Sequence, residues 1–248
     1  MLKFIGVGDL LNQELLNTSA YIKDENKILI IDCGVMSFKR MIDLKIFEDV
    51  ENVYIAITHM HPDHIGGLGS LIFYLNCKNI KPYIIFPKED EEQKQAIVNF
   101  LFLQGVVSDR FYLIADVETV IFSNMLAFSY KTIKHNETLK SFAIEMSFVD
   151  KRIYYLGDNN DEKYQKSVLK KLGENDVVYT DCCGGNGVHH INLKKLAEIY
   201  DEKIRKQVCC MHFISDENII KAKNLGFCVA VMEQSKEEYL KRIVSHNN

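Results

Sequence analysis

Short apolar runs separated by polar turns open the chain and predict β structure. A strand is predicted at Leu2 to Gly6, and two more, at Ser19 to Lys23 and Lys27 to Ile31, are joined by a tight turn. Apolar residues at helical spacing over Met36 to Phe47 predict a helix. The continuous β-branched run from Val53 to Ile57 then predicts a buried strand.

The remainder of the chain alternates between apolar runs and amphipathic stretches. Further helices are predicted through Leu75 and over Glu89–Leu103, Glu162–Leu172, Leu193–Ile204, Asp216–Asn224 and Glu237–Val244. Further strands are predicted at Tyr83–Phe86, Phe111–Ile114, Val117–Phe122, Leu126–Lys131, Phe142–Phe148, Ile153–Leu156, Val177–Thr180, Gln207–Met211 and Cys228–Val231. Each half passes from a β-rich block to mixed helices and strands. Two such halves placed back to back predict an α/β fold, a four-layer αββα sandwich.

The strand ending at Ile57 leads into a hexapeptide that is rich in metal ligands. Its four ligand-type side chains are His59, His61, Asp63 and His64, and Gly66-Gly67 follows before the next helix. Imidazole nitrogen and carboxylate oxygen are the ligands of hydrolytic zinc sites. Four of them within six residues cannot all serve one ion comfortably, so the spacing indicates two adjacent ions.

Composition indicates a globular protein in a reducing compartment. The 248 residues are 47% hydrophobic and 26% charged, without a low-complexity linker, which predicts a single domain over residues 1–248. Seven cysteines, including Cys182-Cys183 and Cys209-Cys210, suit no disulfide framework and favour the cytoplasm. The first residues reach glycine and aspartate too soon for a signal peptide, and no run of 18 apolar residues predicts a membrane span. A net charge of −4 disfavours long nucleic acid as a partner.

The segment Thr58 to Leu68 resembles the signature of the metallo-β-lactamase-fold hydrolase superfamily, and the resemblance extends over nearly the whole chain. It implies three more site residues in order, and this sequence supplies them as His135, Asp158 and His212. By this resemblance, one ion is bound by His59, His61 and His135. The other is bound by Asp63, His64 and His212, and Asp158 bridges the two.

The resemblance also implies the cofactors and the chemistry. Two cations about 3.5–4 Å apart can share a hydroxide and neutralise charge on a phosphoryl or carbonyl oxygen. Zinc is the first choice of metal, with manganese or iron possible because the ligand set mixes nitrogen and oxygen. In the expected mechanism the bridging hydroxide attacks phosphorus in line, while Asp63 orients or deprotonates the water.

A second segment, Thr180 to Leu193, resembles the phosphodiesterase branch of the superfamily, which includes the transfer-RNA 3′-processing nucleases. By that resemblance His190 protonates the leaving alkoxide or binds the phosphate, and Asp181 orients it. The alternative for His190, and more so for His189, is a helix-capping or surface residue. The Gly184 to Gly187 run is either a loop that closes on substrate or reaches a neighbouring subunit, or a plain turn.

Only 22 residues separate His135 from Asp158, where transfer-RNA 3′-processing enzymes usually carry a long arm that grips their substrate. What remains resembles compact phosphodiesterases that act on small cyclic phosphodiesters, among them phage anti-Pycsar enzymes that destroy cyclic-nucleotide signals of bacterial immunity. The prediction is therefore a cyclic-nucleotide phosphodiesterase, with a homodimer expected from related enzymes. The alternatives are a lactone or thioester hydrolase, a transfer-RNA 3′-processing endonuclease, and a metal-bound sensor without turnover.

Overall fold

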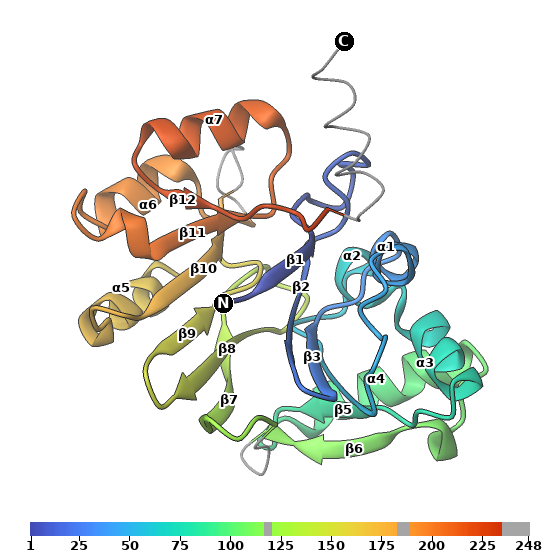
Figure 1. Ribbon diagram of the computed structural model, residues 1–248. Coiled ribbons are helices and arrows are strands. Elements are labelled where there is room, and N and C mark those ends of the chain that lie inside the picture. The colour runs from blue at the N-terminus through green and yellow to red at the C-terminus, as the bar shows by residue number, and fades with distance from the viewer. Residues whose placement is uncertain (117–120, 183–188, 235–248) are drawn as a thin grey trace.

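Two six-stranded sheets face one another in the computed structural model, which describes residues 1–116, 121–182 and 189–234 (Figure 1). The first sheet has the order β1-β2-β3-β4-β5-β6. Its strands are Lys3–Gly6, Ser19–Asp24, Lys27–Ile31, Asn52–Ala56, Tyr83–Phe86 and Tyr112–Ala115. The second sheet has the order β12-β11-β10-β9-β8-β7. From β7 to β12 its strands are Met125–Ile133, Ser141–Phe148, Arg152–Tyr155, Val177–Asp181, Val208–Met211 and Cys228–Val229.

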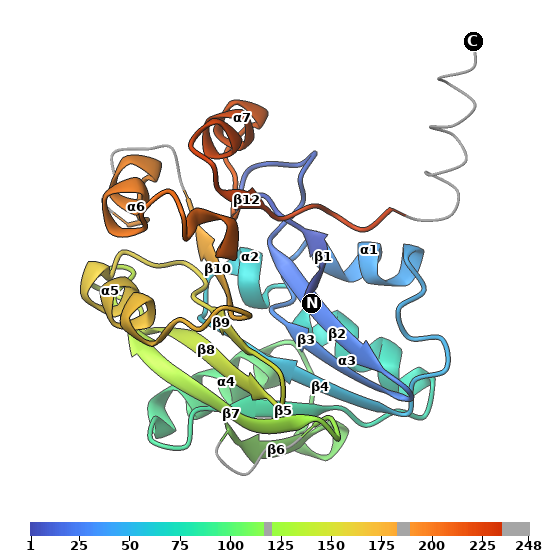
Figure 2. The same ribbon diagram turned by 60° about the vertical axis from the view of Figure 1, so that its left-hand side comes forward.

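Helices cover the outer face of each sheet, so the molecule has four layers (Figures 1 and 2). Beside the first sheet lie α1 Ser37–Asp43, α3 Leu68–Cys77 and α4 Glu91–Leu103. Beside the second lie α5 Glu162–Lys171, α6 Leu193–Ile199 and α7 Asp216–Asn224. Short turns of helix complete the description at α2 Pro62–Ile65, η1 Ser108–Arg110 and η3 Arg205–Gln207. The predicted αββα sandwich is confirmed.

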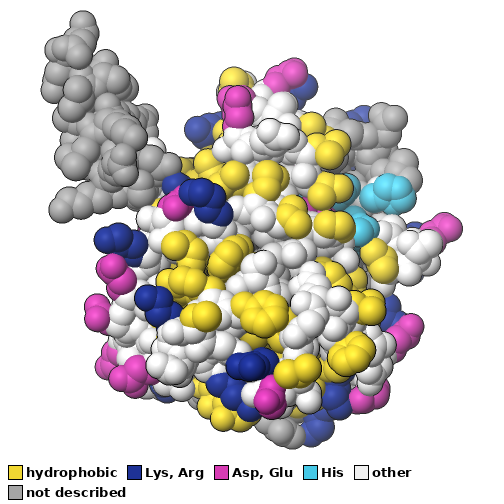
Figure 3. Space-filling view, turned by 90° about the vertical axis from the view of Figure 1, so that its right-hand side faces the viewer, with side chains coloured by type: hydrophobic (Ala, Val, Ile, Leu, Met, Phe, Trp, Pro, Cys, Tyr) yellow, Lys and Arg dark blue, Asp and Glu magenta, His cyan; other side chains and the backbone are white. Residues whose placement is uncertain are grey.

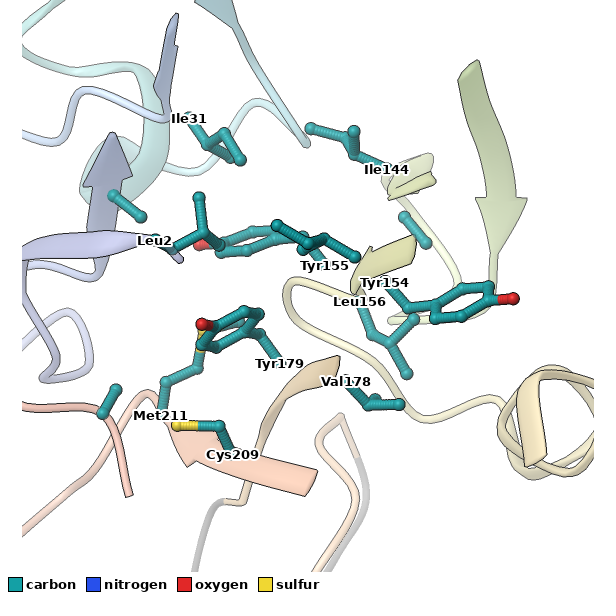
Figure 4. Close-up of a cluster of buried hydrophobic side chains, with 14 of the residues drawn as sticks. Leu2, Ile31, Ile144, Tyr154, Tyr155, Leu156, Val178, Tyr179, Cys209 and Met211 are labelled. Carbon is teal, nitrogen blue, oxygen red and sulfur yellow. The ribbon is translucent and has the colours of Figure 1, made fainter. Parts of the chain in front are cut away.

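Alternation along the strands explains the layers. In β3, Leu29 and Ile31 belong to the cluster between the sheets, whereas Ile28 and Ile30 pack with the helices outside. Figure 4 shows the inner cluster, where Tyr155 of the second sheet lies beside Ile31 of the first sheet and Leu2, which precedes β1. Both faces of β3 are therefore buried, as expected for a strand between two layers.

The two halves of the chain repeat one topology. In each sheet the first three strands pair antiparallel, and the next three add in parallel. This repeat confirms the expectation of two halves with the same sequence of elements. Because parallel strands point the same way, β4, β9, β10 and β11 present their carboxyl ends on the side where the site residues follow them.

A strap formed by residues 230–233 joins the open edges of the two sheets. The amide of Ala230 donates to the Cys210 carbonyl in the second sheet, at 2.8 Å, and the amide of Glu233 donates to Phe4 in the first, also at 2.8 Å. The Glu233 carboxylate accepts a hydrogen bond from Tyr21, at 2.8 Å. Figure 2 shows this segment passing from β12 towards β1. The strap therefore connects the sheets by backbone as well as by packing.

Most predicted boundaries agree with the structure within two residues, but several do not. The helix predicted over Leu193–Ile204 ends at Ile199, because Tyr200 adopts an extended conformation and a turn begins at Asp201. The helix predicted over Met36–Phe47 ends at Asp43, shortly before Lys45 adopts a positive φ. The last three residues of the hexapeptide begin the short helix α2, which ends at Ile65.

Two predicted elements fall wholly or partly outside the described residues. The strand predicted over Val117–Phe122 is wrong at its described end, since Ile121 and Phe122 are buried in the core without strand pairing. Residues 117–120 lie outside the described part of the chain, as does the helix predicted over Glu237–Val244. Among the described residues, no helix is long and apolar enough to cross a membrane.

Candidate metal centre and active site

The predicted ligands follow strand ends on one side of the sandwich. The hexapeptide comes after β4 and runs into α2, whose N-cap is His61. Asp158 follows β9, and His212 directly follows β11. His135 follows β7. The carboxyl ends of neighbouring strands therefore bring together residues that are up to 153 positions apart in sequence.

All seven predicted ligands lie in two clusters that share Asp158. The ligand-type atoms within each cluster lie within 4.8 Å of one another. We call the cluster of His59, His61, His135 and Asp158 the first cluster. We call the cluster of Asp63, His64, Asp158 and His212 the second cluster. This is the division that the superfamily resemblance implies, although binding of metal by these residues remains a prediction.

The two carboxylate oxygens of Asp158 face different clusters. Its Oδ2 lies 3.7 Å from His59 Nε2 and 3.9 Å from His135 Nε2. Its Oδ1 lies 3.4 Å from both His64 Nε2 and His212 Nε2. One side chain can thus contribute an oxygen to each cluster, which is the arrangement expected of a bridging ligand.

The donor set fits divalent cations. In the first cluster, His59 Nε2 lies 2.8 Å from His61 Nδ1, and His135 Nε2 lies 3.3 Å from the same atom. In the second, His64 Nε2 and Asp158 Oδ1 are buried without a hydrogen-bond partner in the described structure. Buried polar atoms without partners are costly, and a cation between them would satisfy both. Mixed nitrogen and oxygen donors suit zinc, and also manganese or iron.

The electrostatics of the two clusters also favour the binding of cations. Burial lowers the pKa of His59 well below its ordinary value, aided by the neighbouring His64, which keeps the ring in the neutral form that binds metal. Burial also lowers the pKa of His64, but the surrounding carboxylates outweigh it and raise the pKa well above the usual range. The site therefore has a negative potential that favours a cation.

Residues behind the clusters fix the orientation of the imidazoles. His135 Nδ1 lies 2.8 Å from the carbonyl oxygen of His189, and because a carbonyl only accepts, Nδ1 carries the proton and leaves Nε2 free for a metal. His64 Nδ1 lies 2.8 Å from Asp32 Oδ2. Asp32 also accepts hydrogen bonds from the backbone amide and hydroxyl of Thr58, at 2.7 and 2.8 Å. Its carboxylate thus links the end of β3 to the hexapeptide.

Asp32 is a residue of the candidate site that the sequence analysis missed. The available signal was an acidic residue in Ile31-Asp32-Cys33-Gly34, directly after a fully apolar strand. Asp32 is completely buried and has a φ of 62°, and His212 has a φ of 60°. Both lie in the left-handed region that non-glycine residues rarely adopt. Strained backbone at two separate strand ends marks this edge as a constrained site.

His190 and Asp181 form a hydrogen-bonded pair beside the two clusters. His190 Nδ1 lies 2.8 Å from Asp181 Oδ2 and 3.9 Å from Asp158 Oδ2. Burial lowers the pKa of His190, but the hydrogen bond and charge of Asp181 raise it to about 9. The imidazole is therefore protonated near neutral pH and can donate a proton or bind an anion. The structure brings these residues together as predicted, while their catalytic roles remain untested.

A cavity of about 580 Å³ opens beside His61, His135 and His190. Figure 3 shows histidine side chains reaching the surface, next to a gathering of hydrophobic side chains. The cavity opens onto the first cluster and onto His190. Cys182 is buried outside the clusters, whereas Cys183 and the Gly184 to Gly187 run lie outside the described residues.

Comparison with known proteins identifies the family. A family model described as "Anti-Pycsar protein Apyc1" matches residues 1–236. The chain belongs to the Apyc1 family. A relative from Paenibacillus harenae is 24% identical over 227 residues, covering 86% of this chain and 89% of the relative. Another, from Bacillus phage 010DV004, is 25% identical over 238 residues, covering 86% and 88%. Both relatives bear the name of the family.

Solved structures show the fold. The metallo-β-lactamase-fold protein YhfI from Bacillus subtilis superposes with a TM-score of 0.68 at 16% identity, covering 94% of this chain and 95% of that one. Human tRNase Z, short form, gives a TM-score of 0.65 at 15% identity, covering 94% and 96%. Family and fold together support the expectation of a metal-dependent hydrolase.

Proposed function

We propose that this protein is a binuclear metal-dependent phosphodiesterase that hydrolyses a small cyclic phosphodiester, with cyclic nucleotides as its substrates. The observation that carries the proposal is the pair of ligand clusters sharing Asp158, with the His190–Asp181 pair beside them. The family name, given to relatives from bacteria and phages, supports a substrate that is a cyclic-nucleotide signal.

The residues of each cluster would bind one metal ion. His59, His61 and His135 would hold one ion, with zinc as the first choice, and Asp63, His64 and His212 would hold the other. When bound, the two ions would activate water and neutralise charge on the phosphoryl oxygens. Asp63 would orient that water through its carboxylate. The protonated His190, fixed by Asp181, would donate a proton to the ribose oxygen that leaves.

The connection between His135 and Asp158 supports a small substrate. It consists of the loop before β8, the strand β8, a short turn and β9. No additional segment extends from it, so the gripping arm expected of transfer-RNA 3′-processing enzymes is absent at this position. A compact connection leaves the cavity open to a small ligand.

The proposal also covers the oligomeric state and the compartment of the protein. We propose a homodimer in the cytoplasm, where a cyclic-nucleotide signal would be found. Among the described residues, five cysteines are free thiols, which agrees with a reducing compartment: Cys33, Cys77, Cys209, Cys210 and Cys228. Light scattering on the purified protein measures the oligomeric state directly, and a monomer at micromolar concentration would contradict the dimer.

Purified protein supplied with zinc or manganese should hydrolyse bis(p-nitrophenyl) phosphate and at least one 3′,5′-cyclic nucleotide. A chelator should abolish both activities, and so should Asp158→Ala, because it removes one oxygen from each cluster. Product chromatography over cyclic mono- and dinucleotides measures the outcome. Turnover of a lactone or thioester, with no phosphodiester in the panel cleaved, would overturn the proposal.

A further inference from the structure

One wall of the cavity beside the first cluster is the loop Lys134 to Thr138, which takes no part in the proposed mechanism. His189 and His190, together with His61 and His135 of the first cluster, also line the cavity. Among the described residues that line it, histidine is the only aromatic type. The wall therefore offers charged and hydrogen-bonding groups, with no phenyl or phenol ring on which a nucleobase could stack.

The Lys134 to Thr138 loop is held in place by hydrogen bonds within the protein. Asn136 Oδ1 accepts hydrogen bonds from the amides of Thr138 and Leu139, at 2.9 and 2.7 Å. The carbonyl of Lys134 accepts one from the amide of Asn160, at 2.7 Å, two residues after Asp158. The position of Lys134 is thus tied to the chain that carries the bridging carboxylate, while its side chain takes no part in these bonds.

Lys134 contributes an uncommitted positive charge to this wall. Across the described ranges its ammonium forms no ion pair, whereas Lys140 nearby is held by Asp90, at 2.9 Å, and Glu92, at 2.8 Å. Glu137, on the same wall, also forms no ion pair there. A free cation at the mouth of a cavity attracts an anionic ligand, and a free carboxylate beside it opposes that attraction.

We propose that this wall is an anion subsite in which the Lys134 ammonium binds a non-bridging phosphate oxygen of the substrate. This inference rests on the proposed function for the identity of the anion. Lys134 binds and positions the phosphodiester and takes no part in bond breaking, so its contribution falls on KM and leaves kcat nearly unchanged. Glu137 acts with the opposite sign, because it repels the same anion.

Charge variants around the cavity test the subsite. Lys134→Glu should raise KM for a 3′,5′-cyclic nucleotide about tenfold or more, with kcat within about twofold of wild type. Lys134→Arg keeps the positive charge and should therefore leave KM close to the wild-type value. Glu137→Gln should lower KM. The matched control is Lys131→Glu, the same charge change on an exposed lysine of β7 outside this cavity, and it should leave KM unchanged.

A binding measurement keeps the test independent of turnover. Calorimetric titration of the zinc-loaded protein with inorganic phosphate should give about tenfold weaker binding for Lys134→Glu than for wild type or Lys131→Glu. Equal affinities in all three proteins would overturn the subsite, even if the enzyme is active. Loss of phosphate binding in Lys134→Glu alone, in a protein that cleaves no phosphodiester, would support the subsite and contradict the proposed function.

Discussion

At the scale of single residues, the site contains two kinds of side chain. Those of the two clusters would bind cations, and the His190–Asp181 pair would donate a proton. The imidazoles of the clusters are oriented by fixed acceptors, namely Asp32 behind His64 and the His189 carbonyl behind His135. His190 also pairs with a carboxylate, that of Asp181, but it lies outside the two ligand clusters and lines the cavity. One residue type therefore serves two purposes, and the position of each ring relative to the clusters decides which.

The proposed acid role of His190 predicts a dependence on the leaving group. His190→Ala should lower kcat for a 3′,5′-cyclic nucleotide by about 10²–10⁴-fold, because a ribose alkoxide needs a proton as it departs. The same variant should lose far less with bis(p-nitrophenyl) phosphate, whose nitrophenolate departs without one. Parallel kinetics on the two substrates check this. Equal losses on both would assign His190 to phosphate binding instead.

The sequence predicted which residues gather in the two clusters, but it did not predict Asp32 behind them. His59, His61, Asp63 and His64 stand in one recognisable segment, and a family pattern gave the order of the others. Asp32 was not predicted, because its role depends on the packing of the β3 end against Thr58, which no short motif encodes. Lys134 likewise became a candidate only from the structure, which shows that it lines the cavity and forms no ion pair among the described residues.

At the scale of elements, the positions of the strand ends determine how precisely the site residues are placed. Polar side chains between elements hold these strand ends in position. Gly157 has a φ of 55°, which permits the turn between β9 and Asp158. At the other end of β9, the amide of Arg152 donates to Asp176, at 2.8 Å, and its guanidinium pairs with the same carboxylate, at 2.7 Å. Asp176 thus ties β9 to the start of β10, the strand that ends in Asp181.

Removing the Asp176 charge should destabilise the fold in a pH-dependent way. Burial raises the pKa of Asp176, but hydrogen bonds from Gly173 and Arg152 outweigh it and hold the pKa below its ordinary value of 3.8. The stabilisation is therefore present above that pH and lost as the pH falls through the lower folded-state pKa. Asp176→Asn should cost about 1.5–3 kcal/mol at pH 7.

Urea denaturation of wild type and Asp176→Asn at pH 7, 5 and 3.5 measures this difference. It should be constant between the first two values and smaller at the third. Lys163→Gln serves as the control, because that exposed lysine lies in the first turn of α5, at the opposite end of the helix from Lys171 and Gly173. A difference that stays the same at all three values would show that the charge of Asp176 contributes nothing.

Element prediction succeeded where one residue pattern dominates and failed where tertiary contacts decide. The strand Tyr83–Phe86 and the helix Asp216–Asn224 were predicted with the observed boundaries. The helix after Leu193 was predicted too long, because Tyr200 leaves helical geometry to place its hydroxyl 2.6 Å from the Gln165 side chain inside the core. The spacing of apolar residues within one segment does not predict a hydrogen bond to a residue that is distant in sequence.

At the scale of the whole molecule, one apolar cluster includes residues of both sheets. Leu29 and Ile31 come from the first half and Ile144 and Tyr155 from the second. The strap at residues 230–233 adds hydrogen bonds between the sheet edges. Separating the halves would expose this shared core, so we expect them to unfold together.

We predict that metal-free protein unfolds in one cooperative transition, as a single domain over residues 1–248. Circular dichroism should report the loss of helices, and fluorescence of the 12 tyrosines the loss of core packing, because the chain has no tryptophan. The two midpoints in urea should coincide. Two separate midpoints would show that the halves are independent domains.

Both clusters take side chains from the two halves of the repeat. His59 and His61 meet His135 in the first cluster, and Asp63 and His64 meet His212 in the second. An isolated N-terminal half would lack the carboxylate common to both clusters. During synthesis, the first cluster can be completed once Asp158 has emerged, but the second must await His212. A chain that stops before His212 would thus keep the first cluster and lack a member of the second, so full metal loading would report that both halves of the chain are present.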